Sequence, residues 1–440
     1  MTATLLLLAL MVLTLLVVVV LVLPREARRS ALVVLAVVAV VAATSVDAPT
    51  SVSLAAQGFA ALLLSLSLVV GPFESKRLRS PLTGAALAFL VLSVVTTAAF
   101  EPAALGLAVR IGGLEALTAV AVSQFRSHDV ARLTSALIGL ACVEAVLGIL
   151  EALVLHQPFP WGRRVVEGRE MYTNANVLLG NGFQRVEGTL GHAIPFATLL
   201  TVAACLLVRT WSVRGPHLRW IAMSLCVAGL VLSGSRTGVL GLGLCFLLLI
   251  LTSRSTGRGL RVVTVTCTLA GATALFWNDV RDIVARTIET GSYTNRSSAL
   301  DSVPGLVARP FREALLGSGW GSELDLYARG LLPQNGFTIV DNQFVTTLAT
   351  TGVVGAGLLT LLFLTSFVAG DRTRRALLVL LVVMVFSFDF VAWASIGTLC
   401  FLCLCTPWQT AAPSPGQSER AVPSGPCPSP GRRIEVAAAK

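Results

Sequence analysis

Three short polar clusters stand out in a chain that is otherwise strongly apolar. They are Arg185-Val-Glu-Gly-Thr-Leu-Gly-His192, Ser233-Gly-Ser-Arg-Thr-Gly238 and, much later, Val340-Asp-Asn-Gln-Phe-Val345. The guanidinium of arginine stays charged and presents a flat fork of donors that fits two phosphate oxygens at once. The first two clusters therefore indicate anion binding, and Arg296, between the second and the third, is a further candidate.

The turn that contains Arg236 can bind an anion in a second way. If a helix opens at Thr237, its free backbone amides point to the same place as the arginine side chain. The alternative is a tight connection between two helices whose arginine reaches to phospholipid headgroups. The turn alone does not separate these two interpretations.

The Asp341-Asn342 pair precedes an apolar segment and also has two interpretations. A carboxylate there can accept a proton or orient a hydroxyl group. Aspartate and asparagine are also good N-caps, so the pair can simply begin a long helix. Both roles can hold at once. Glu187 and His192 are further candidates for a base, although a lone histidine is more often a packing residue.

The elements that position these clusters must be membrane helices. Hydrophobic residues make up 55% of the 440 residues, charged residues only 13%, and the mean hydropathy is +0.81. A soluble protein has about a quarter of its residues charged, and a disordered chain is poor in leucine and valine, so both classes are excluded. A helix needs about 20 apolar residues to cross a bilayer. Thirteen such runs are found, the last two short enough to be one broken segment: 3–23, 30–46, 52–70, 82–100, 103–123, 131–155, 188–208, 219–233, 237–253, 262–277, 342–369, 376–390 and 392–406.

Basic junctions orient such a bundle because short loops rich in lysine and arginine remain in the cytoplasm. Six junctions with two or three basic residues each fall on one side of the thirteen-span arrangement, at 25–29, 76–79, 126–132, 209–219, 254–261 and 372–375. The N-terminus is thereby predicted outside and the C-terminus inside. Most of the formal net charge of +10 serves this orientation, so it does not indicate a nucleic-acid partner.

The predicted organisation follows from these spans. Residues 1–155 form the N-terminal transmembrane helices and 156–187 an extracytoplasmic loop. Residues 188–277 form further transmembrane helices with the Gly-Ser-Arg-Thr-Gly turn on the outside. A large extracytoplasmic loop at 278–341 is followed by the C-terminal helices at 342–407 and a disordered cytoplasmic tail at 408–440.

Several polar or reactive side chains lie inside the spans. Arg110 and Glu115 lie in one span and Glu144 and Glu151 in the next. These charges are expected to have structural pairing roles, with proton relay as the alternative. The apolar run 400–405 holds three cysteines without a histidine or carboxylate beside them. They are interpreted as small packing residues, and no metal site is predicted.

Taken in order, the clusters resemble the O-antigen ligase and Wzy-type polymerase superfamily. Arg185 precedes a Gly-Thr helix start, and Ser235-Arg236-Thr237-Gly238 follows a later span. Arg296 lies in a loop that leads to Gly317-Ser-Gly-Trp-Gly321. The Asp-Asn pair then opens a helix that carries Thr351-Gly-Val-Val-Gly355. The resemblance covers residues 180–360, and the preceding spans match in number and topology only.

This resemblance implies an all-α, GT-C-like polytopic membrane protein with about 12–13 transmembrane helices and a large extracytoplasmic loop. It implies a bacterial plasma-membrane enzyme, active on the extracytoplasmic side, that moves glycan from an undecaprenyl-diphosphate-linked oligosaccharide to a hydroxyl of an acceptor glycan. No cofactor and no metal are implied. The expected roles are diphosphate binding by Arg185, Arg236 and Arg296, base catalysis by Asp341, then Glu187, then His192, and acceptor positioning by Asn342, Ser235 and Thr237.

The leading prediction is a polymerase that extends a polyprenyl-linked polysaccharide, because Asp341 stands where lipopolysaccharide ligases typically have histidine. The alternative is a ligase that transfers glycan to a lipid, cell-wall or protein acceptor. A flippase or transporter of lipid-linked oligosaccharide belongs to a different class and would be expected to show internal repeats, of which none is convincing. A peptidoglycan polymerase of the shape, elongation, division and sporulation type fits the motifs less well.

Overall fold

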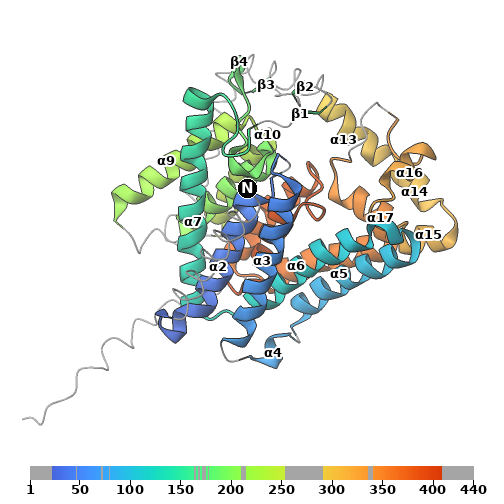
Figure 1. Cartoon of the computed structure of the whole chain (residues 1–440), viewed down its shortest axis with the longest axis horizontal. Coiled ribbons are helices and arrows are strands. Elements are labelled where there is room, and N and C mark those ends of the chain that lie inside the picture. Colours follow the sequence, from blue (N-terminus) through green and yellow to red (C-terminus); the bar gives the residue numbers. More distant parts are fainter. Residues whose placement is uncertain are drawn as a thin grey trace, which may run out of the picture.

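The computed structural model describes residues 22–408, apart from 46, 71–72, 79, 163–164, 167–168, 171–174, 177, 210–214, 253–290 and 335–339. Within these residues the chain is helical except for two small antiparallel hairpins (Figure 1). The prediction of an all-α polytopic membrane protein is therefore confirmed. The predicted spans 3–23 and 262–277 and nearly all of the tail 408–440 lie outside the described residues.

Each of the other eleven predicted spans coincides with a helix. These helices are α2 (Arg25–Ala43), α3 (Thr50–Val69), α5 (Pro81–Phe100), α6 (Leu105–Ser123), α7 (Ser127–Leu150), α8 (Ala193–Arg209), α9 (Pro216–Ser233), α10 (Arg236–Leu251), α17 (Gln343–Ala369), α18 (Arg372–Val385) and α19 (Ala394–Cys405). Among the described residues, α3, α5, α6, α7 and α17 are long and apolar enough to cross a membrane, α6 together with η1 (Pro102–Ala104) and α7 together with η2 (Glu151–Leu155). The helices α8, α9, α10 and α19 are apolar but shorter.

The remaining elements are short. One end of the bundle carries the hairpin of β1 (Val165–Val166) and β2 (Arg169–Glu170), the hairpin of β3 (Ala175–Asn176) and β4 (Gly180–Gln184), and the single turn η3 (Gly188–Leu190). Four helices precede α17, namely α13 (Gly291–Asp301), α14 (Val303–Val307), α15 (Phe311–Leu316) and α16 (Glu323–Ala328), and a single-turn helix, α4 (Ser75–Leu78), lies before α5.

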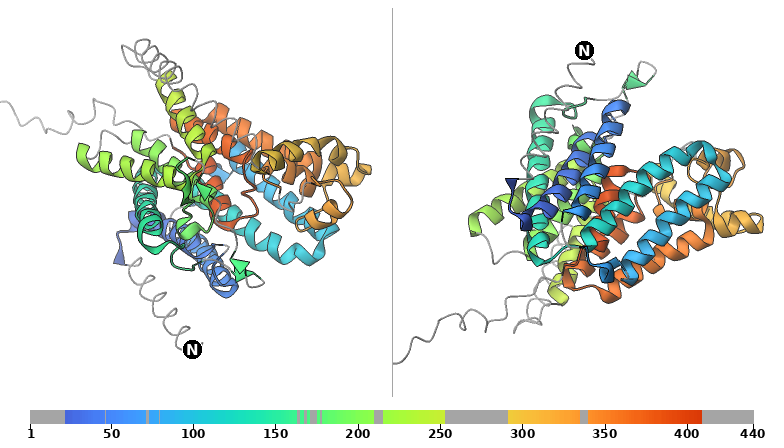
Figure 2. Two further views of the ribbon diagram at one scale, coloured as in Figure 1. Left: turned by 90° about the horizontal axis from the view of Figure 1, so that it is seen from above. Right: turned by 60° about the horizontal axis from the view of Figure 1, so that its bottom comes forward.

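Helix α8 lies at the centre of the bundle. It packs on α7, α9, α10, α18 and α19, and every residue from Ala193 to Leu207 is buried. A helix that is apolar all round is stable only when neighbours cover every face. Figure 2 shows α5, α6 and α17 as a second group that runs away from this centre towards α13–α16. The first polar cluster therefore lies at the start of a helix that is enclosed on all sides.

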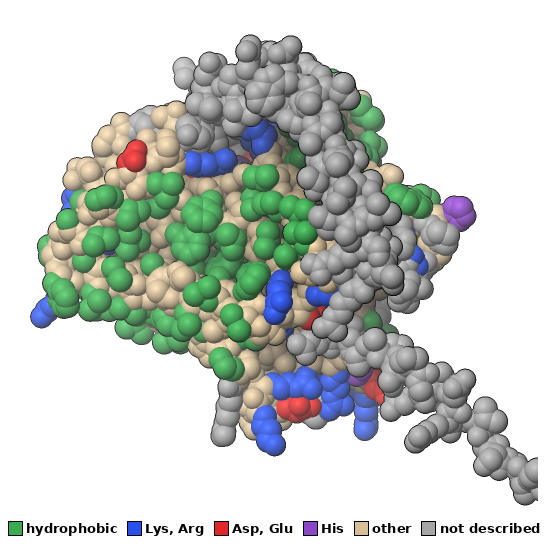
Figure 3. Space-filling view, turned by 180° about the vertical axis from the view of Figure 1, so that it is seen from behind, with side chains coloured by type: hydrophobic (Ala, Val, Ile, Leu, Met, Phe, Trp, Pro, Cys, Tyr) green, Lys and Arg blue, Asp and Glu red, His purple; other side chains and the backbone are tan. Residues whose placement is uncertain are grey.

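The predicted basic junctions lie together at one end of the bundle, here called the basic end. Arg29 donates to the carbonyls of Ser67 and Gln124 at 3.2 Å each, and Arg126 pairs with Glu74 at 3.4 Å. Figure 3 shows lysine and arginine side chains gathered at this lower end, below a broad apolar surface. The opposite end, with the described residues of 151–192 and 294–342, is here called the loop end. The junctions 209–219 and 254–261 lie partly or wholly outside the described residues.

Helix α17 is broken at Gly352, which has φ 66° and ψ −167°. The break removes helical donors from the carbonyls of the preceding turn, and buried carbonyls need other partners. Arg309, only 6% exposed, donates to Leu348 O at 2.8 Å and to Ala349 O at 3.1 Å. The amide of Gly319 donates to Thr350 O at 2.8 Å. The loop end is therefore tied into the broken helix by hydrogen bonds.

The segment Gly317-Ser-Gly-Trp-Gly321 makes this close approach possible. Gly317 has φ +79°, and a Cβ there would overlap the backbone of Thr350 and Thr351. The amide of Trp320 donates to Thr97 Oγ1 at 2.9 Å, at the end of α5. The glycine motif thus joins the end of α5 to the break in α17, and its role is structural.

Replacing Gly317 by alanine is expected to destabilise the fold by more than about 3 kcal/mol, because the methyl group meets backbone that cannot move aside. Gly330 is the matched control, since it has φ +68° and no atom lies within 4 Å of the place that a methyl group would take. Its alanine variant should cost only the left-handed strain of about 1–2 kcal/mol. Thermal unfolding of the two variants in detergent measures the difference. Equal melting temperatures would contradict the steric role of Gly317.

The segment 376–406 contains two helices, α18 and α19, separated by a break at 386–393. The break is fastened to the first turn of α17, where Gln343 Oε1 accepts from the amide of Val391 at 2.7 Å. The last two predicted spans are therefore separate helices, and the break between them reaches the loop end.

The charged residues inside the spans do not pair with one another as expected. Arg110 is exposed on α6, whereas Glu115 is fully buried and neither of its carboxyl oxygens has a hydrogen-bond partner among the described residues. The expected pairing of Arg110 with Glu115 is therefore wrong. Glu144 and Glu151 do have partners, but these are backbone groups of the first polar cluster.

Candidate active site

The first cluster is built against the end of α9. The amide of Val186 donates to Leu232 O at 3.2 Å, and Arg185 Nε donates to Ser233 O at 2.9 Å. Asn176, fully buried, donates from Nδ2 to Leu232 O at 2.8 Å. The last carbonyls of a helix have no partners within it, so this strand-like segment caps α9. As a result Arg185 lies beside the turn that leads to Arg236.

Two carboxylates from α7 and η2 hold the turn that follows Arg185. Glu151 accepts from the amides of Glu187 and Gly188, at 3.2 and 2.9 Å. Glu144 accepts from the amide of Thr189 at 3.0 Å and from its hydroxyl at 2.5 Å. The partners of these two membrane carboxylates are thus turn amides, and their role is to fix the backbone from which Arg185 projects.

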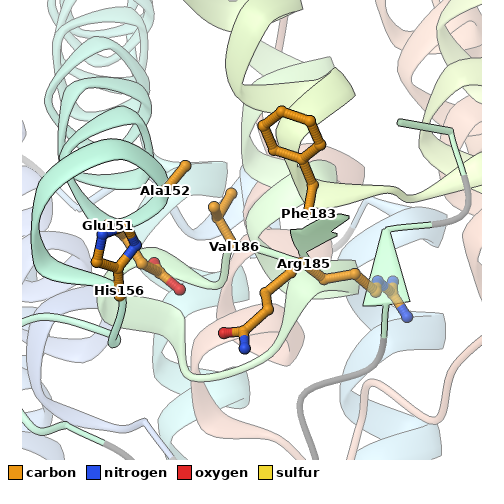
Figure 4. Close-up of a pocket in the computed structure, with 7 residues that line it drawn as sticks. Glu151, Ala152, His156, Phe183, Arg185 and Val186 are labelled. Carbon is orange, nitrogen blue, oxygen red and sulfur yellow. The ribbon is translucent and has the colours of Figure 1, made fainter. Parts of the chain in front are cut away.

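A cavity of about 350 Å³ lies beside this turn. Its lining includes Glu151, His156, Phe183 and Arg185 (Figure 4). Figure 4 shows Glu151 and His156 together on one side, whereas the guanidinium of Arg185 extends away from them. The arginine charge is therefore directed towards the centre of the loop end rather than to these two side chains.

The second cluster is a sharp turn followed at once by α10. Gly234 has φ +62°, and Ser235 caps the helix by accepting from the amide of Gly238 at 3.2 Å. Arg236 is the first residue of α10, and the hydroxyl of Thr237 lies 3.4 Å from Ser235 Oγ. The helix thus opens one residue earlier than the sequence indicates, with the arginine at its amino end, where the helix dipole is positive.

The third cluster brings Asp341 against α13. Asn295, 3% exposed, donates from Nδ2 to Asp341 Oδ2 at 3.3 Å. The cap of α17 is Asn342, whose Oδ1 accepts from the amides of Phe344 and Val345 at 3.0 and 3.2 Å. The capping role and the carboxylate role therefore fall on different residues of the pair, because Asp341 does not cap the helix.

Arg296 lies next along α13 and faces the break between α18 and α19. Its Nη2 donates to Ser387 O at 3.2 Å, and its buried Nε has no hydrogen-bond partner among the described residues. His192 lies against the same break, with its ring centroid 5.0 Å from that of Phe388 and 5.7 Å from that of Trp393. The break therefore positions one arginine and one histidine of the candidate site.

The charges of this site act on one another. Burial lowers the pKa of Arg185 to about 10, where Glu187 opposes the shift and Arg296 and Arg236 add to it. Burial raises the pKa of Asp341, whereas Arg296, the hydrogen bond from Asn295 and Arg185 lower it. Burial lowers the pKa of His192 to about 3, helped by the charges of Arg185 and Arg296. These couplings place the three arginines, Glu187, His192 and Asp341 in one electrostatic site.

His192 accepts a hydrogen bond through a ring nitrogen, which only a neutral imidazole can do. Its Nδ1 accepts from the amide of Ile194 at 3.2 Å, so the ring proton is assigned to Nε2. A ring with this protonation can donate a hydrogen bond from Nε2 but offers no free lone pair there. This arrangement favours a positioning role over a basic one.

Several residues of this arrangement are missing from the expectations drawn from sequence. They are Asn295 and the break at 386–393, and the turn-binding role of Glu144 and Glu151 was likewise not expected. An aspartate and a serine between phenylalanines, in Ser387-Phe-Asp-Phe390, are a signal for the break, because such residues interrupt an apolar span. Among the described residues, no group of three or more histidine, cysteine, aspartate or glutamate side chains is arranged to hold a metal, and metal independence stays a prediction.

Together the fold and the site define a polytopic membrane protein with an arginine cluster around a partly buried carboxylate. Residues 221–360 match the family model described as O-antigen ligase. The family resemblance indicated by the motifs is therefore confirmed for this part of the chain. The match contains Arg236, Arg296 and Asp341, whereas Arg185 precedes it. No curated protein matches the chain.

The family match supports glycan transfer of the O-antigen ligase or polymerase kind as the chemistry of this site. Such a reaction needs groups that hold an anionic donor and a group that receives a proton. Both kinds of group lie at the loop end.

Proposed function

We propose that the protein is a glycan polymerase of the bacterial plasma membrane, with its site on the extracytoplasmic side. In this proposal it transfers oligosaccharide repeat units from undecaprenyl diphosphate to a sugar hydroxyl of an acceptor glycan. The observation that carries the proposal is that Arg185 and Arg296, from distant segments, act on an aspartate that does not cap its helix, while Arg236 lies close enough to act on both of these arginines.

The arginines are assigned to the diphosphate of the donor. Arg185 and Arg296 each use one donor group on a backbone carbonyl, which fixes the guanidinium plane and leaves other N–H groups for a ligand. Charge grows on the diphosphate as it leaves, so fixed cations stabilise the transition state more than the bound donor. This selectivity for the transition state accelerates the reaction and requires no metal ion.

Asp341 is assigned as the base. The acceptor oxygen attacks the anomeric carbon, the bond from that carbon to the diphosphate oxygen breaks, and the hydroxyl proton passes to the Asp341 carboxylate. Undecaprenyl diphosphate leaves with the bonding electron pair, and direct displacement inverts the anomeric centre. Glu187 is the second candidate for the base. His192, Ser235, Thr237 and Asn342 are assigned positioning roles.

Donor binding strengthens the base in this arrangement. The charges of Arg296 and Arg185 favour the ionised form of Asp341. When a diphosphate neutralises these arginines, they stabilise the ionised carboxylate less. The pKa of Asp341 then rises further towards neutrality. A base is most effective when its pKa lies near the operating pH. The carboxylate thus becomes a better proton acceptor once the donor is in place.

The pH dependence of the Asn295→Ala variant tests this assignment. The rate should rise with pH as Asp341 loses its proton, and the hydrogen bond from Asn295 lowers the pKa of Asp341. Removing that bond should move the acid limb of the kcat/KM profile to higher pH while most of the alkaline plateau remains. A lower plateau with an unmoved acid limb would mean that Asn295 supports the fold only or that Asp341 is not the base.

A polymerase is preferred to a ligase because Asp341 replaces the histidine typical of lipopolysaccharide ligases. Glycan chain length in a deletion strain tests this preference. A polymerase defect leaves single repeat units, whereas a ligase defect leaves full-length chains that are not attached to their acceptor. The second outcome would overturn the polymerase assignment and leave the glycan-transfer chemistry in place.

A further inference from the structure

A second polar cavity lies at the basic end, on the far side of the bundle from the candidate active site. Its volume is about 590 Å³, and it lies where α5, α6, α7, α17, α18 and α19 begin or end. Among the described residues that line it are three arginines, Arg77, Arg126 and Arg374, and no carboxylate. This excess of cationic lining indicates an anionic ligand.

Hydrogen bonds and ion pairs fix the arginine side chains but do not use all of their N–H donors. Arg77 Nε pairs with Glu74 at 2.8 Å, and its Nη1 donates to Phe125 O at 2.5 Å. Arg374 Nη2 donates to Thr406 O at 2.6 Å, whereas its buried Nε has no hydrogen-bond partner among the described residues. A buried charged donor without a partner is costly. Arg374 is thus a cation of the cavity lining whose donors are not all satisfied by the described residues.

The positive ends of two long helices add to this charge. Helix α5 begins at Pro81 and α7 at Ser127, and both residues line the cavity. The amino end of a helix carries a partial positive charge. The carboxylates nearest the arginines are Glu74, which is shared by Arg77 and Arg126, Asp129, whose Oδ2 accepts from the amide of Arg126, and Asp371, whose Oδ1 accepts from the amide of Arg374. None of these three lines the cavity.

The rest of the lining combines hydroxyl and apolar side chains. The hydroxyl groups belong to Ser80, Thr83, Ser123, Ser127 and Thr365, and the apolar surface is formed by Pro81, Leu82, Phe125, Ala369, Cys405 and Pro407. A free phosphate makes no use of the apolar surface, whereas an amphiphile does. The cavity also lies at the end of the membrane helices, which is the level of the phospholipid headgroups.

We propose that this cavity binds the phosphodiester headgroup of an acidic membrane phospholipid, with Arg374, Arg77 and Arg126 on the phosphate and the start of an acyl chain on the apolar lining. By the predicted orientation the lipid comes from the inner leaflet. Basic pockets between membrane helices on the cytoplasmic side recognise acidic lipids in this way. The site is separate from the glycan-transfer site, and its existence does not depend on the proposed function.

Native mass spectrometry of the full-length protein in mild detergent tests the proposal, with equal amounts of phosphatidylglycerol and phosphatidylcholine added. The wild type should retain phosphatidylglycerol about tenfold better than phosphatidylcholine. Arg374→Gln should lose this preference. Arg375→Gln is the matched control, because Arg375 is half-buried on the same helix turn, where it donates to Phe367 O, and does not line the cavity. Its preference should equal that of the wild type.

A charge-neutral variant keeps the test decisive if Arg374→Gln folds poorly. Ala369 is exposed and lines the cavity, so Ala369→Trp fills the space without a change in charge or core packing. It should also abolish the preference. If both Arg374→Gln and Ala369→Trp keep the preference for phosphatidylglycerol, as the control Arg375→Gln does, the proposal is overturned. Displacement of the lipid by millimolar inorganic phosphate would overturn it too, because the site would then be one for free anions.

Discussion

Asp341→Asn is expected to lower kcat for glycan transfer by about 10²–10⁴-fold, the usual contribution of a positioned general base. The variant should keep its affinity for the lipid-linked donor, because the arginines that are assigned to the diphosphate are unchanged. Its thermal stability should also match that of the wild type. The side chain is not the cap of α17, since that function belongs to Asn342. Release of undecaprenyl diphosphate and thermal unfolding of the purified variant measure the two quantities.

Asp325→Asn is the control for this substitution. Asp325 is an exposed aspartate on α16 that pairs with Arg329 at 3.4 Å, away from the three arginines. It should keep full activity. If instead Asp341→Asn is fully active, the proton goes elsewhere, and Glu187 becomes the candidate to replace.

Arg236→Lys is expected to lower kcat/KM by about 10²–10³-fold, the effect of removing one donor from the site of a developing anion. Lysine keeps the charge but lacks the planar fork that binds two phosphate oxygens. The helix start should survive, because the cap is Ser235 and the substituted side chain follows it. The loss should therefore occur without a change in expression or membrane insertion.

Arg329→Lys supplies the comparison for the arginine variant. Arg329 makes ion pairs with Glu313 at 2.9 Å and with Asp325 at 3.4 Å on the protein surface, and exposed pairs contribute little. This variant should be fully active. Equal activity of the two lysine variants would remove Arg236 from the diphosphate site and return it to the role of a headgroup anchor.

The membrane helices were accessible from the sequence because apolar run length is a direct physical requirement of the bilayer. The order of the clusters also carried information, since Arg236 and Asp341 each stand at a helix start, where the sequence places them. Tertiary partners were harder to foresee. The sequence offers no reason for Asn295 rather than another polar residue to reach Asp341.

The partners of the glycine motif and of the membrane carboxylates could not be foreseen from the sequence either. Gly317 is needed because the backbone of α17 passes against it, and this contact depends on a helix break some 35 residues later along the chain. Glu144 and Glu151 were expected to find charged partners within the membrane. Turn amides satisfied them instead, since a carboxylate accepts from backbone N–H groups as readily as from arginine.

The excess of arginine in an apolar chain thus has three structural explanations. At the basic end Arg29, Arg126 and Arg372 bind carbonyls or acids of neighbouring segments, and three arginines line the cavity proposed for an acidic lipid. Arg309 replaces the missing helical donors at the break in α17. Arg185, Arg236 and Arg296 form the candidate site, where the charges of Arg185 and Arg296 act on Asp341 and that of Arg236 acts on the other two arginines.

The most direct test of the central claim is a reaction of the purified protein with undecaprenyl-diphosphate-linked oligosaccharide in detergent. The account predicts that the oligosaccharide is transferred to an acceptor glycan, that the chain lengthens by one repeat unit per event, and that one undecaprenyl diphosphate is released each time. Movement of the intact lipid-linked oligosaccharide across reconstituted vesicles, without lengthening and without release of the lipid diphosphate, would contradict it.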